Sequence, residues 1–333
     1  MDDLCFHEFY FTPLQFDETA ATWEYLQPVA AAFRANIVNI SQLALLPVTL
    51  IRASTMRERA FLKACSGLTG KLIPSSEDLR DKDMVSMLEC ERMSFIIEQE
   101  QNELDDRSLM MTNIAAYKAI LDDFAALYGP KLQLKSLLVG AIINLCAAVE
   151  VFQKDLWIAA LNHGPKHFFE RAAKQQGQWK TVDLEHINDA EYDVVNKLGW
   201  LLVAAKRYKF DSMKETADAY VAAFGKSAYS VMNPKGRDYS DVLVLDAARN
   251  LLLHAQGFAD KDFRLKVERA NSPSFPGLRD LANGAELPIT GGFTKAHAES
   301  AMRYCTSLLK FVDACITKVS NHEHEPGTDS QSP

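Results

Sequence analysis

Hydrophobic spacing constrains this chain more than any other feature of its sequence. Over most of the 333 residues, apolar side chains recur at the 3.6-residue period of an α-helix, and Gly and Pro concentrate at a few breaks. This pattern predicts an all-α protein built as a helical bundle. We expect helices over the ranges 19–66, 132–162, 183–208, 212–224, 240–256 and 294–319. Only the ranges 6–14 and 285–293 have a composition that could hold short strands.

A domain boundary is predicted at Tyr128-Gly129-Pro130, because a C-cap Gly followed by Pro ends a helix. We therefore expect a helical N-terminal region over residues 1–129 and a second helical domain over 130–320. Residues 321–333 contain no apolar side chain and are expected to form a disordered tail. Within the first region, the strongly acidic stretch 77–107 is predicted to be helical, with Ser75 or Ser76 as its N-cap.

The composition narrows the class of protein. A formal net charge of -8 argues against binding nucleic acid by bulk charge alone, which needs many Lys and Arg contacts to phosphate. Acidic residues follow Met1 where a secretory signal would carry basic ones, and the longest nearly uncharged apolar stretch, 137–149, is shorter than the ~20 residues of a spanning helix. We expect a soluble cytoplasmic protein with no membrane contact. Its six scattered cysteines are expected to be reduced.

Most motifs of known catalytic sites are absent. Residues 67–72 resemble a phosphate loop at first sight, but that loop needs Gly where Cys65 stands and Ser or Thr where Leu72 stands. The chain has no G-x-S-x-G, H-E-x-x-H or G-x-G-x-x-G pattern. Its closely spaced histidine pairs lie in the polar tail or across a helix break, so we expect no metal site and no cofactor.

The helix expected over residues 240–256 carries a narrow polar stripe on an otherwise apolar surface. Asp246, Asn250 and His254 follow each other at i, i+4 spacing, and Arg249 lies beside them. Buried polar groups are costly unless they are paired or used. One interpretation is a structural ion pair between Arg249 and Asp246. The other is a site where a guanidinium holds a phosphodiester and an imidazole transfers a proton. Arg249 and His254 are i, i+5, about 140° apart on a straight helix, which a second copy of the helix would resolve.

The segment 249–254, R-N-L-L-L-H, followed by Gly257, Phe258, Asp260 and Phe263, resembles the R-N-x-x-x-H signature of HEPN domains. The long apolar helix containing Glu150-Val151-Phe152 is similar to the helix that opens such domains, and the helix after Leu287-Pro288-Ile289-Thr290 to the one that closes them. The resemblance covers residues 132–319 and is greatest to the branch related to RiboL-PSP HEPN proteins. Residues 1–129 resemble no known family.

This resemblance implies an all-α, HEPN-like domain and a metal-independent endoribonuclease that acts as a homodimer on RNA. In that family His254 would act as general base or acid on the ribose 2′-hydroxyl, Arg249 would hold the scissile phosphate, and Asn250 would orient both. The expected product is a 2′,3′-cyclic phosphate. Because many members are toxins or phage-defence effectors, the resemblance also implies an antitoxin or a regulatory protein as a partner.

Two further features bear on this interpretation. Glu150 lies among apolar neighbours and is expected to pair with Arg249, because a buried carboxylate needs a partner. Basic residues interleaved with aromatic ones suit single-stranded RNA, although a solvated helix face has the same composition. The candidate RNA-binding residues are Lys206, Arg207, Lys209, Lys235 and Arg237. The main alternative is a non-catalytic HEPN-like module for dimerisation or protein binding.

Overall fold

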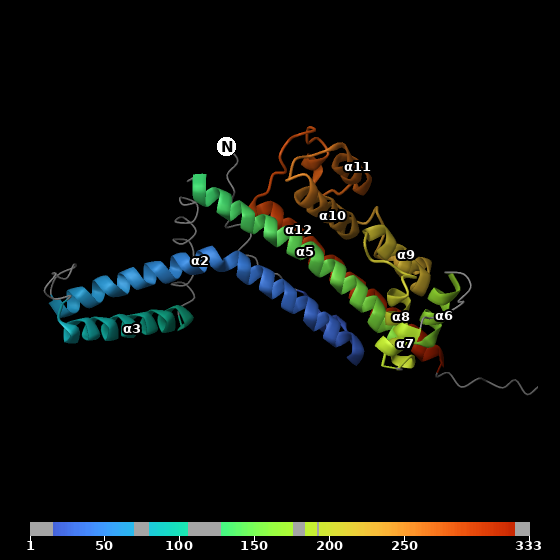
Figure 1. The fold of residues 1–333 in the computed structure, drawn as a ribbon, viewed down its shortest axis with the longest axis horizontal. Coiled ribbons are helices and arrows are strands. Elements are labelled where there is room, and N and C mark those ends of the chain that lie inside the picture. Colours follow the sequence, from blue (N-terminus) through green and yellow to red (C-terminus); the bar gives the residue numbers. More distant parts are fainter. Residues whose placement is uncertain (1–15, 70–79, 106–127, 176–183, 192, 324–333) are drawn as a thin grey trace, which may run out of the picture. The chain divides into compact units, whose positions relative to one another are not determined.

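The protein is all-α, as predicted. The computed structural model describes residues 16–69, 80–105, 128–175, 184–191 and 193–323, and within these ranges it contains helices and no strand (Figure 1). The expectation of a strand over 285–293 is wrong: a single antiparallel bridge joins Phe258 to Glu286, and the chain enters a helix at Gly291. One isolated bridge has no neighbouring strand with which to form a ladder. The predicted strand at 6–14 and the predicted N-cap at Ser75 or Ser76 lie outside the described residues.

The chain divides into two compact units. Of the described residues, the larger unit contains 16–41 and 138–323, and the smaller contains 42–69, 80–105 and 128–137. Helices α2 (Gln27–Thr69) and α5 (Tyr128–His163) each contribute residues to both units. Residues 16–41, which precede the predicted boundary at Gly129, therefore pack within the same unit as the second half of the chain.

The smaller unit is built from the second part of α2 and from α3 (Lys82–Asp105), which lies in the predicted acidic helix. Asp81 caps α3 by accepting a hydrogen bond from the backbone N–H of Asp83 at 2.9 Å. The buried contact between the two helices involves Ala64 and Cys65 of α2 and Leu88 of α3. Apolar burial on one face of each helix is what holds this pair together.

The larger unit is organised around α5 and α12 (Gly291–Glu323), which lie side by side in Figure 1. Gln153 of α5 donates a hydrogen bond to the hydroxyl of Tyr304 of α12 at 2.7 Å. One turn further along the same face of α5, the indole N–H of Trp157 donates to the carbonyl of Ala219, in α9 (Met213–Phe224), at 3.0 Å. Phe33 of α2 packs on Phe152 with 4.7 Å between ring centroids. Helix α5 is therefore a core helix of the larger unit, with α2, α9 and α12 packed against it.

The ends of the important helices follow their sequence signals. Helix α5 ends at His163, directly before Gly164-Pro165, and Ser212 caps α9 by accepting from the N–H of Glu215. The motif helix, α10, spans Arg237–His254 and begins three residues earlier than expected. Its end is closed by Gly257, whose φ of 84° lies in the left-handed region and whose N–H donates to the carbonyl of Leu251 at 3.2 Å.

Other helix boundaries differ from expectation. The single helix expected over 183–208 is wrong, because the chain forms three short elements there: α7 (Leu184–Asp189), η3 (Val195–Lys197) and α8 (Leu198–Ala204). Glu191 adopts a left-handed φ of 54°, which no continuous helix allows. The range 19–66 begins with two 3-10 turns, η1 (Glu18–Ala20) and η2 (Glu24–Leu26), before α2.

Two further helices of the larger unit carry no prediction from the sequence. They are α6 (Lys166–Gln175) and α11 (Lys261–Ala270). Helix α11 does have a readable cap, because the carboxylate of Asp260 accepts from the N–H of Phe263 at 2.7 Å. Helix α12 extends to Glu323 and so includes the first residues of the predicted tail; residues 324–333 lie outside the described ranges.

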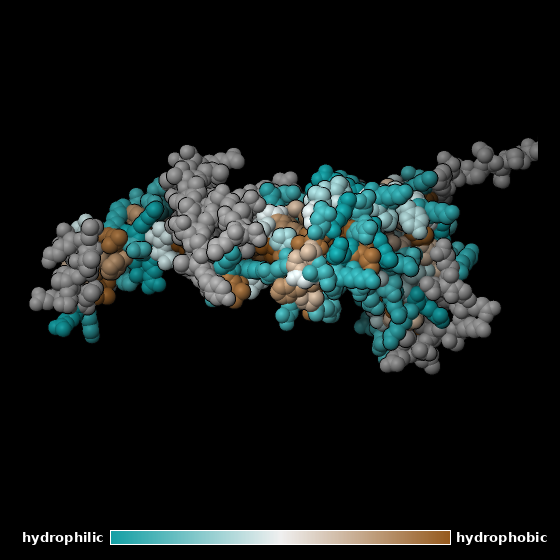
Figure 2. Space-filling model, turned by 90° about the horizontal axis from the view of Figure 1, so that it is seen from above, coloured by the Kyte–Doolittle hydropathy of each residue, from teal (hydrophilic) through white to brown (hydrophobic). Residues whose placement is uncertain are grey.

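One stretch of the described chain, Lys131–His163 in α5, is long and apolar enough by length and composition to cross a membrane. In its most apolar window 44% of the residues are buried inside the protein. The face of the larger unit seen in Figure 2 is mostly hydrophilic, with scattered hydrophobic patches. Because the apolar surface of a core helix passes the same test as a spanning helix, these observations are compatible with a soluble protein.

Candidate functional site

The polar side chains of α10 meet a carboxylate from α5 at the surface of the larger unit. Nη2 of Arg249 donates a hydrogen bond to Oε1 of Glu150 and another to Oδ1 of Asp246, the latter at 3.0 Å. Asn250 donates to the same carboxylate of Asp246 at 3.4 Å. We call these four residues the Arg249 cluster. The expected pairing of Glu150 with Arg249 is therefore present.

The Arg249 cluster is partly shielded from solvent. The exposed fractions are 19% for the Arg249 side chain, 27% for Glu150 and 17% for Asp246. Both carboxylate contacts use Nη2 of Arg249, so Nη1 binds neither carboxylate. An arginine held in this way keeps its guanidinium in a fixed orientation and retains donors for a phosphate oxygen.

Burial and charge shift the acidities of the groups around Arg249. Burial raises the pKa of Glu150, and the neighbouring Asp246 raises it further, while Arg249 acts in the opposite direction. Burial also raises the pKa of the Cys146 thiol, one turn earlier on α5, to about 12. Cys146 is therefore a neutral thiol at physiological pH and not a nucleophile.

Three ligand atoms from Cys146, Glu150 and Asp246 lie within 4.8 Å of one another, a spacing that a metal ion could use. The guanidinium of Arg249 already bonds to both of these carboxylates. Its positive charge takes the role that a cation would have between two acids, and the thiol is protonated. The cluster therefore suits a metal-independent role better than a metal site.

His254 is the last residue of α10 and is exposed. Within the described part of the chain it makes no hydrogen bond and no ion pair, with Arg249 or with any other residue. The i, i+5 spacing directs the side chains of Arg249 and His254 to different sides of the helix, which explains why these two residues do not meet. One chain thus brings together Glu150, Asp246, Arg249 and Asn250 but leaves His254 apart from them.

A hollow of about 490 Å³ adjoins Glu150. The predicted RNA-binding residues Lys206 and Lys209 line it, together with Lys154 of α5. Lys154 was missed by the sequence reasoning, although its i, i+4 spacing from Glu150 places both on one helix face. Three ammonium groups line this hollow together with the carboxylates of Glu150 and Asp211, so its formal charge is positive by one.

The aromatic residues between these lysines do not serve as a free stacking surface. Tyr208 is buried, donates its hydroxyl to the carbonyl of Ala172 at 2.7 Å, and packs on Trp157 with 5.0 Å between centroids. Phe210 contacts the same indole at 5.6 Å. Tyr208 and Phe210 thus pack on Trp157 in the core, and the neighbouring lysines are exposed at the surface.

The remaining predicted RNA-binding residues are elsewhere. Arg207 is exposed and does not line the hollow. Arg237 is the first residue of α10, about 18 Å along the helix axis from Arg249 at 1.5 Å per residue, and Lys235 precedes this helix. Nε of Arg237 donates to the hydroxyl of Ser274 at 3.2 Å. These three residues are not brought together with Lys206 and Lys209.

A second polar group on α10 escaped the sequence reasoning entirely. Asp241 is fully buried, and its carboxylate accepts hydrogen bonds from the hydroxyls of Ser272, Ser274 and Ser300, the last two at 2.7 and 2.8 Å. We call this set the Asp241 clamp. It ties the loop after α11 and the start of α12 to α10, a structural role that needs no ligand.

Comparison of the chain with protein-family profiles, with curated proteins and with solved structures finds no match in any of the three. The function of the Arg249 cluster therefore has to be argued from its own chemistry.

Proposed function

We propose that the protein is a metal-independent endoribonuclease of the HEPN type that cleaves RNA by attack of the 2′-hydroxyl on the adjacent phosphate. The observation that carries this proposal is the Arg249 cluster: a guanidinium held by Glu150 and Asp246, partly exposed, beside a hollow lined by lysines. Such a guanidinium is ordered before the substrate arrives, which is how charge developing on a phosphate is best stabilised.

The proposed roles follow from the side chains. Arg249 binds the scissile phosphate through donors that Glu150 and Asp246 leave free, and these two acids position it. His254 accepts the proton of the 2′-hydroxyl or donates one to the leaving oxygen, and Asn250 orients the reacting groups. Lys154, Lys206 and Lys209 guide the flanking phosphates. The product would be a 2′,3′-cyclic phosphate.

We further propose that the enzyme is a two-fold homodimer. Within one chain Arg249 and His254 do not meet, so a shared active site needs His254 or Arg249 from a second copy. Leu253 and Phe258, on either side of the end of α10, are exposed large apolar residues that a partner could cover. Sedimentation at micromolar concentration should detect a dimer; a monomer that cleaves RNA at full rate would contradict the shared site.

The alternative function is a non-catalytic dimerisation or protein-binding module. A specific observation favours it: Arg249, Glu150 and Asp246 satisfy one another, as the members of a purely structural ion-pair network do. In this alternative His254 has no functional role. By the resemblance to HEPN domains alone, the proposal also includes a role as a toxin or phage-defence effector, an antitoxin or regulatory partner, and a cytoplasmic location. No disulfide joins the five described cysteines, which fits a reducing compartment.

The decisive experiment is to incubate the purified full chain with tRNA and with mRNA in the presence of EDTA. The proposal expects cleavage that EDTA does not inhibit and fragments that end in 2′,3′-cyclic phosphate. No cleavage of either RNA across a wide range of salt concentrations would favour the binding module. Cleavage that EDTA abolishes would also contradict the proposal, because it would require a metal.

A further inference from the structure

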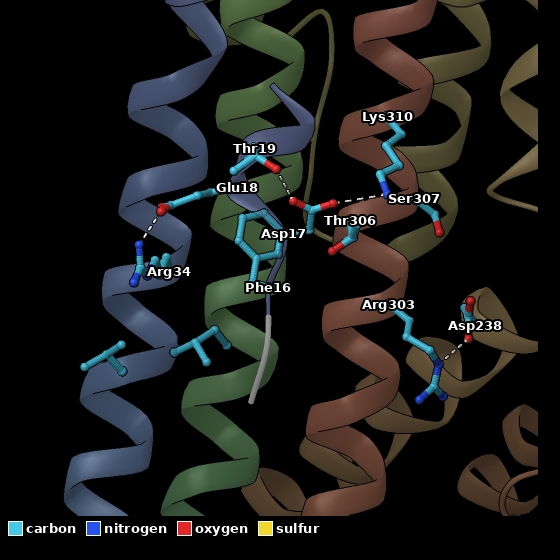
Figure 3. Close-up of a pocket in the computed structure, with 12 residues that line it drawn as sticks. Phe16, Asp17, Glu18, Thr19, Arg34, Asp238, Arg303, Thr306, Ser307 and Lys310 are labelled. Carbon is cyan, nitrogen blue, oxygen red and sulfur yellow. Dashed lines mark hydrogen bonds and ion pairs between the residues drawn. The ribbon is translucent and has the colours of Figure 1, made fainter. Parts of the chain in front are cut away.

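A second hollow, of about 810 Å³, lies in the larger unit between η1, the first part of α2 and α12 (Figure 3). Its volume falls within the ≈ 300–1,000 Å³ range of small-molecule sites. None of its lining residues belongs to the Arg249 cluster or lines the lysine hollow. It is a separate feature of the protein, and the proposed nuclease does not use it.

Three cationic side chains line the hollow, and each is paired with a carboxylate; Nη2 of Arg303 also lies 3.9 Å from Oδ2 of the buried Asp241. Arg34 bonds to Glu18, Lys310 to Asp17 at 3.2 Å, and Arg303 to Asp238 at 3.0 Å. The exposed fractions of the cations are 59%, 58% and 45% in the same order. Ion pairs that are this exposed contribute little stability, so an incoming anion can replace the carboxylates at small cost.

The carboxylates of Asp17 and Glu18 show that the cations of the hollow bind oxygen anions. Glu18 is the first residue of η1 and Asp17 directly precedes it. Figure 3 shows Asp17 directed toward α12 and Glu18 directed toward α2. Oxygen anions thus already occupy positions on Lys310 and Arg34 in this structure. A phosphate offers the same type of oxygen with more charge, and it suits guanidinium donors especially well.

The walls supply more hydrogen-bond donors than the acids use. Arg303 donates through Nε to Asp238 and through Nη2 to the hydroxyl of Ser300 at 2.9 Å, which leaves Nη1. The hydroxyls of Thr306 and Ser307, in the middle of α12, make no hydrogen bond to any described residue. A hydroxyl inside a helix can instead bond back to the preceding turn, as Thr317 does in the same helix at 2.9 Å, so these two hydroxyls keep their donors for a ligand.

One wall of the hollow is apolar. Phe16 packs edge-on against Phe33, with 4.8 Å between ring centroids, and is held in place by this contact. Ile37 and Val38 of α2 continue the wall, the first buried and the second exposed. Three apolar side chains can cover one flat ring but not a long acyl chain. The hollow therefore combines a donor-rich region for phosphate with a small apolar wall.

From this combination we propose that the hollow binds a nucleoside phosphate, with the phosphate on Arg34, Arg303 and Lys310 and the base against the apolar wall. Thr306 and Ser307 donate to phosphate or sugar oxygens, and the ligand displaces Asp17 and Glu18 from their cations. The ligand site is thus distinct from the proposed RNA-cleaving cluster, and its existence does not depend on that activity.

Isothermal titration of the full chain with ATP, ADP, AMP and inorganic phosphate, without RNA, tests this proposal. We expect saturable binding of at least one nucleotide with a Kd between micromolar and millimolar. Arg303→Gln and Lys310→Gln should each weaken binding about tenfold, because each removes one charge-assisted contact. The matched control is Lys166→Gln, which removes an exposed lysine paired with Glu170 in α6 and should leave binding unchanged.

A further variant tests the hollow without changing charge. Val38→Trp fills part of the space from an exposed position, so it should abolish binding while the melting temperature stays near that of the original protein. This variant keeps the proposal testable even if a charge variant folds poorly. Nucleotide binding that survives Val38→Trp, Arg303→Gln and Lys310→Gln unchanged would place the ligand elsewhere.

Three other results would overturn the proposal. The first is the absence of saturable binding by any of the three nucleotides at millimolar concentration. The second is binding of inorganic phosphate as tight as that of AMP, which would leave the apolar wall without a role. The third is binding to vesicles that contain phosphatidic acid without binding of soluble nucleotides, which would identify the ligand as a lipid headgroup.

Discussion

Two polar groups on the same helix, the Asp241 clamp and the Arg249 cluster, differ in how completely their hydrogen bonds are satisfied. Asp241 is fully buried, and three serine hydroxyls donate to its carboxylate. Arg249 is 19% exposed, and both of its carboxylate contacts use one nitrogen. A saturated, buried group can only stabilise the fold, whereas a fixed and partly exposed guanidinium can also bind a ligand. Their positions on α10 do not reveal this difference.

The largest expected effect comes from His254, which joins the Arg249 cluster only in the proposed shared active site. His254→Ala should reduce RNA cleavage by roughly 10²–10⁴-fold, the usual contribution of general acid–base catalysis. The melting temperature should not change, because His254 is exposed and makes no hydrogen bond to a described residue. The control is His167→Ala, another exposed histidine. Cleavage by His254→Ala at the original rate would show that the proposed site is wrong even if the protein is a nuclease.

Asp241→Ala should have the largest effect on stability, about 3 kcal/mol, because it leaves three hydroxyls without their acceptor in a buried region. Urea denaturation would measure it. Asp238→Ala, one turn earlier on α10 and near the surface, is the control and should change stability by less than about 1 kcal/mol. If both variants lose the same stability, the contrast between saturated and exposed groups fails. RNA cleavage per folded molecule should be unchanged in Asp241→Ala.

Arg249→Ala should lose both cleavage and stability, the latter by about 1–3 kcal/mol, because Glu150 and Asp246 lose their shared partner. Arg249→Lys should recover only part of the cleavage, since an ammonium lacks the bidentate fork. The double variant Arg249→Ala with Glu150→Gln should regain stability, because one of the two repelling charges is gone, but not cleavage. If the double variant regained both, Arg249 would be purely structural.

The stability loss of Arg249→Ala should also depend on pH. Burial already raises the pKa of Glu150, and removing Arg249 raises it further. A carboxyl whose pKa is higher in the folded than in the unfolded state gains stability as the pH falls, because the folded state binds the proton more tightly. The loss in free energy of unfolding caused by Arg249→Ala should therefore be smaller at pH 5 than at pH 8. An equal deficit at both pH values would show that Glu150 is not the stranded group.

The smallest expected effect concerns His297, a fully buried residue of α12 near the Asp241 clamp. Its ring stacks on Phe275 with 4.0 Å between centroids, and burial lowers its pKa to about 3. The unfolded chain binds a proton at pH values where the folded protein does not, so stability should fall between pH 6.5 and pH 3 by at most about 1.4 kcal/mol per pH unit.

His297→Phe should remove this part of the acid sensitivity, because it keeps an aromatic ring and loses the titrating group. Phe293→Leu is the matched control: it disturbs the packing next to His297 but should retain the pH dependence. Denaturation curves at pH 6.5 and pH 5 would measure both. Equal pH dependence in His297→Phe and the original protein would contradict the burial of a neutral imidazole.

Much of the larger unit could be predicted from local signals. Gly164-Pro165 marked the end of α5, Ser212 the start of α9, and Gly257 the end of α10. These signals act on the backbone within a few residues, so they are visible in a single sequence. The break between α7 and α8 was not visible, because the left-handed φ of 54° falls at Glu191, a residue type that does not signal this conformation.

The candidate site was predictable only in part. The i, i+3 and i, i+4 spacing on α10 was enough to place Asp246, Arg249 and Asn250 together, and the apolar surroundings of Glu150 implied a partner for it. Spacing could not identify Lys154 as a neighbour of Lys206 and Lys209, nor show that Tyr208 is buried against Trp157. These facts depend on how α5 meets the chain after α8.

By itself the sequence determined the helical class, the ends of several helices and the polar stripe of α10, since helix period and caps are set by neighbouring residues. Only the tertiary structure decided that residues 16–41 join the larger unit, that Asp241 finds three hydroxyls, and that Arg34, Arg303 and Lys310 line one hollow. These outcomes depend on contacts between residues far apart in the chain. Close packing and the hydrogen bonding of buried polar groups determine which of these residues come together.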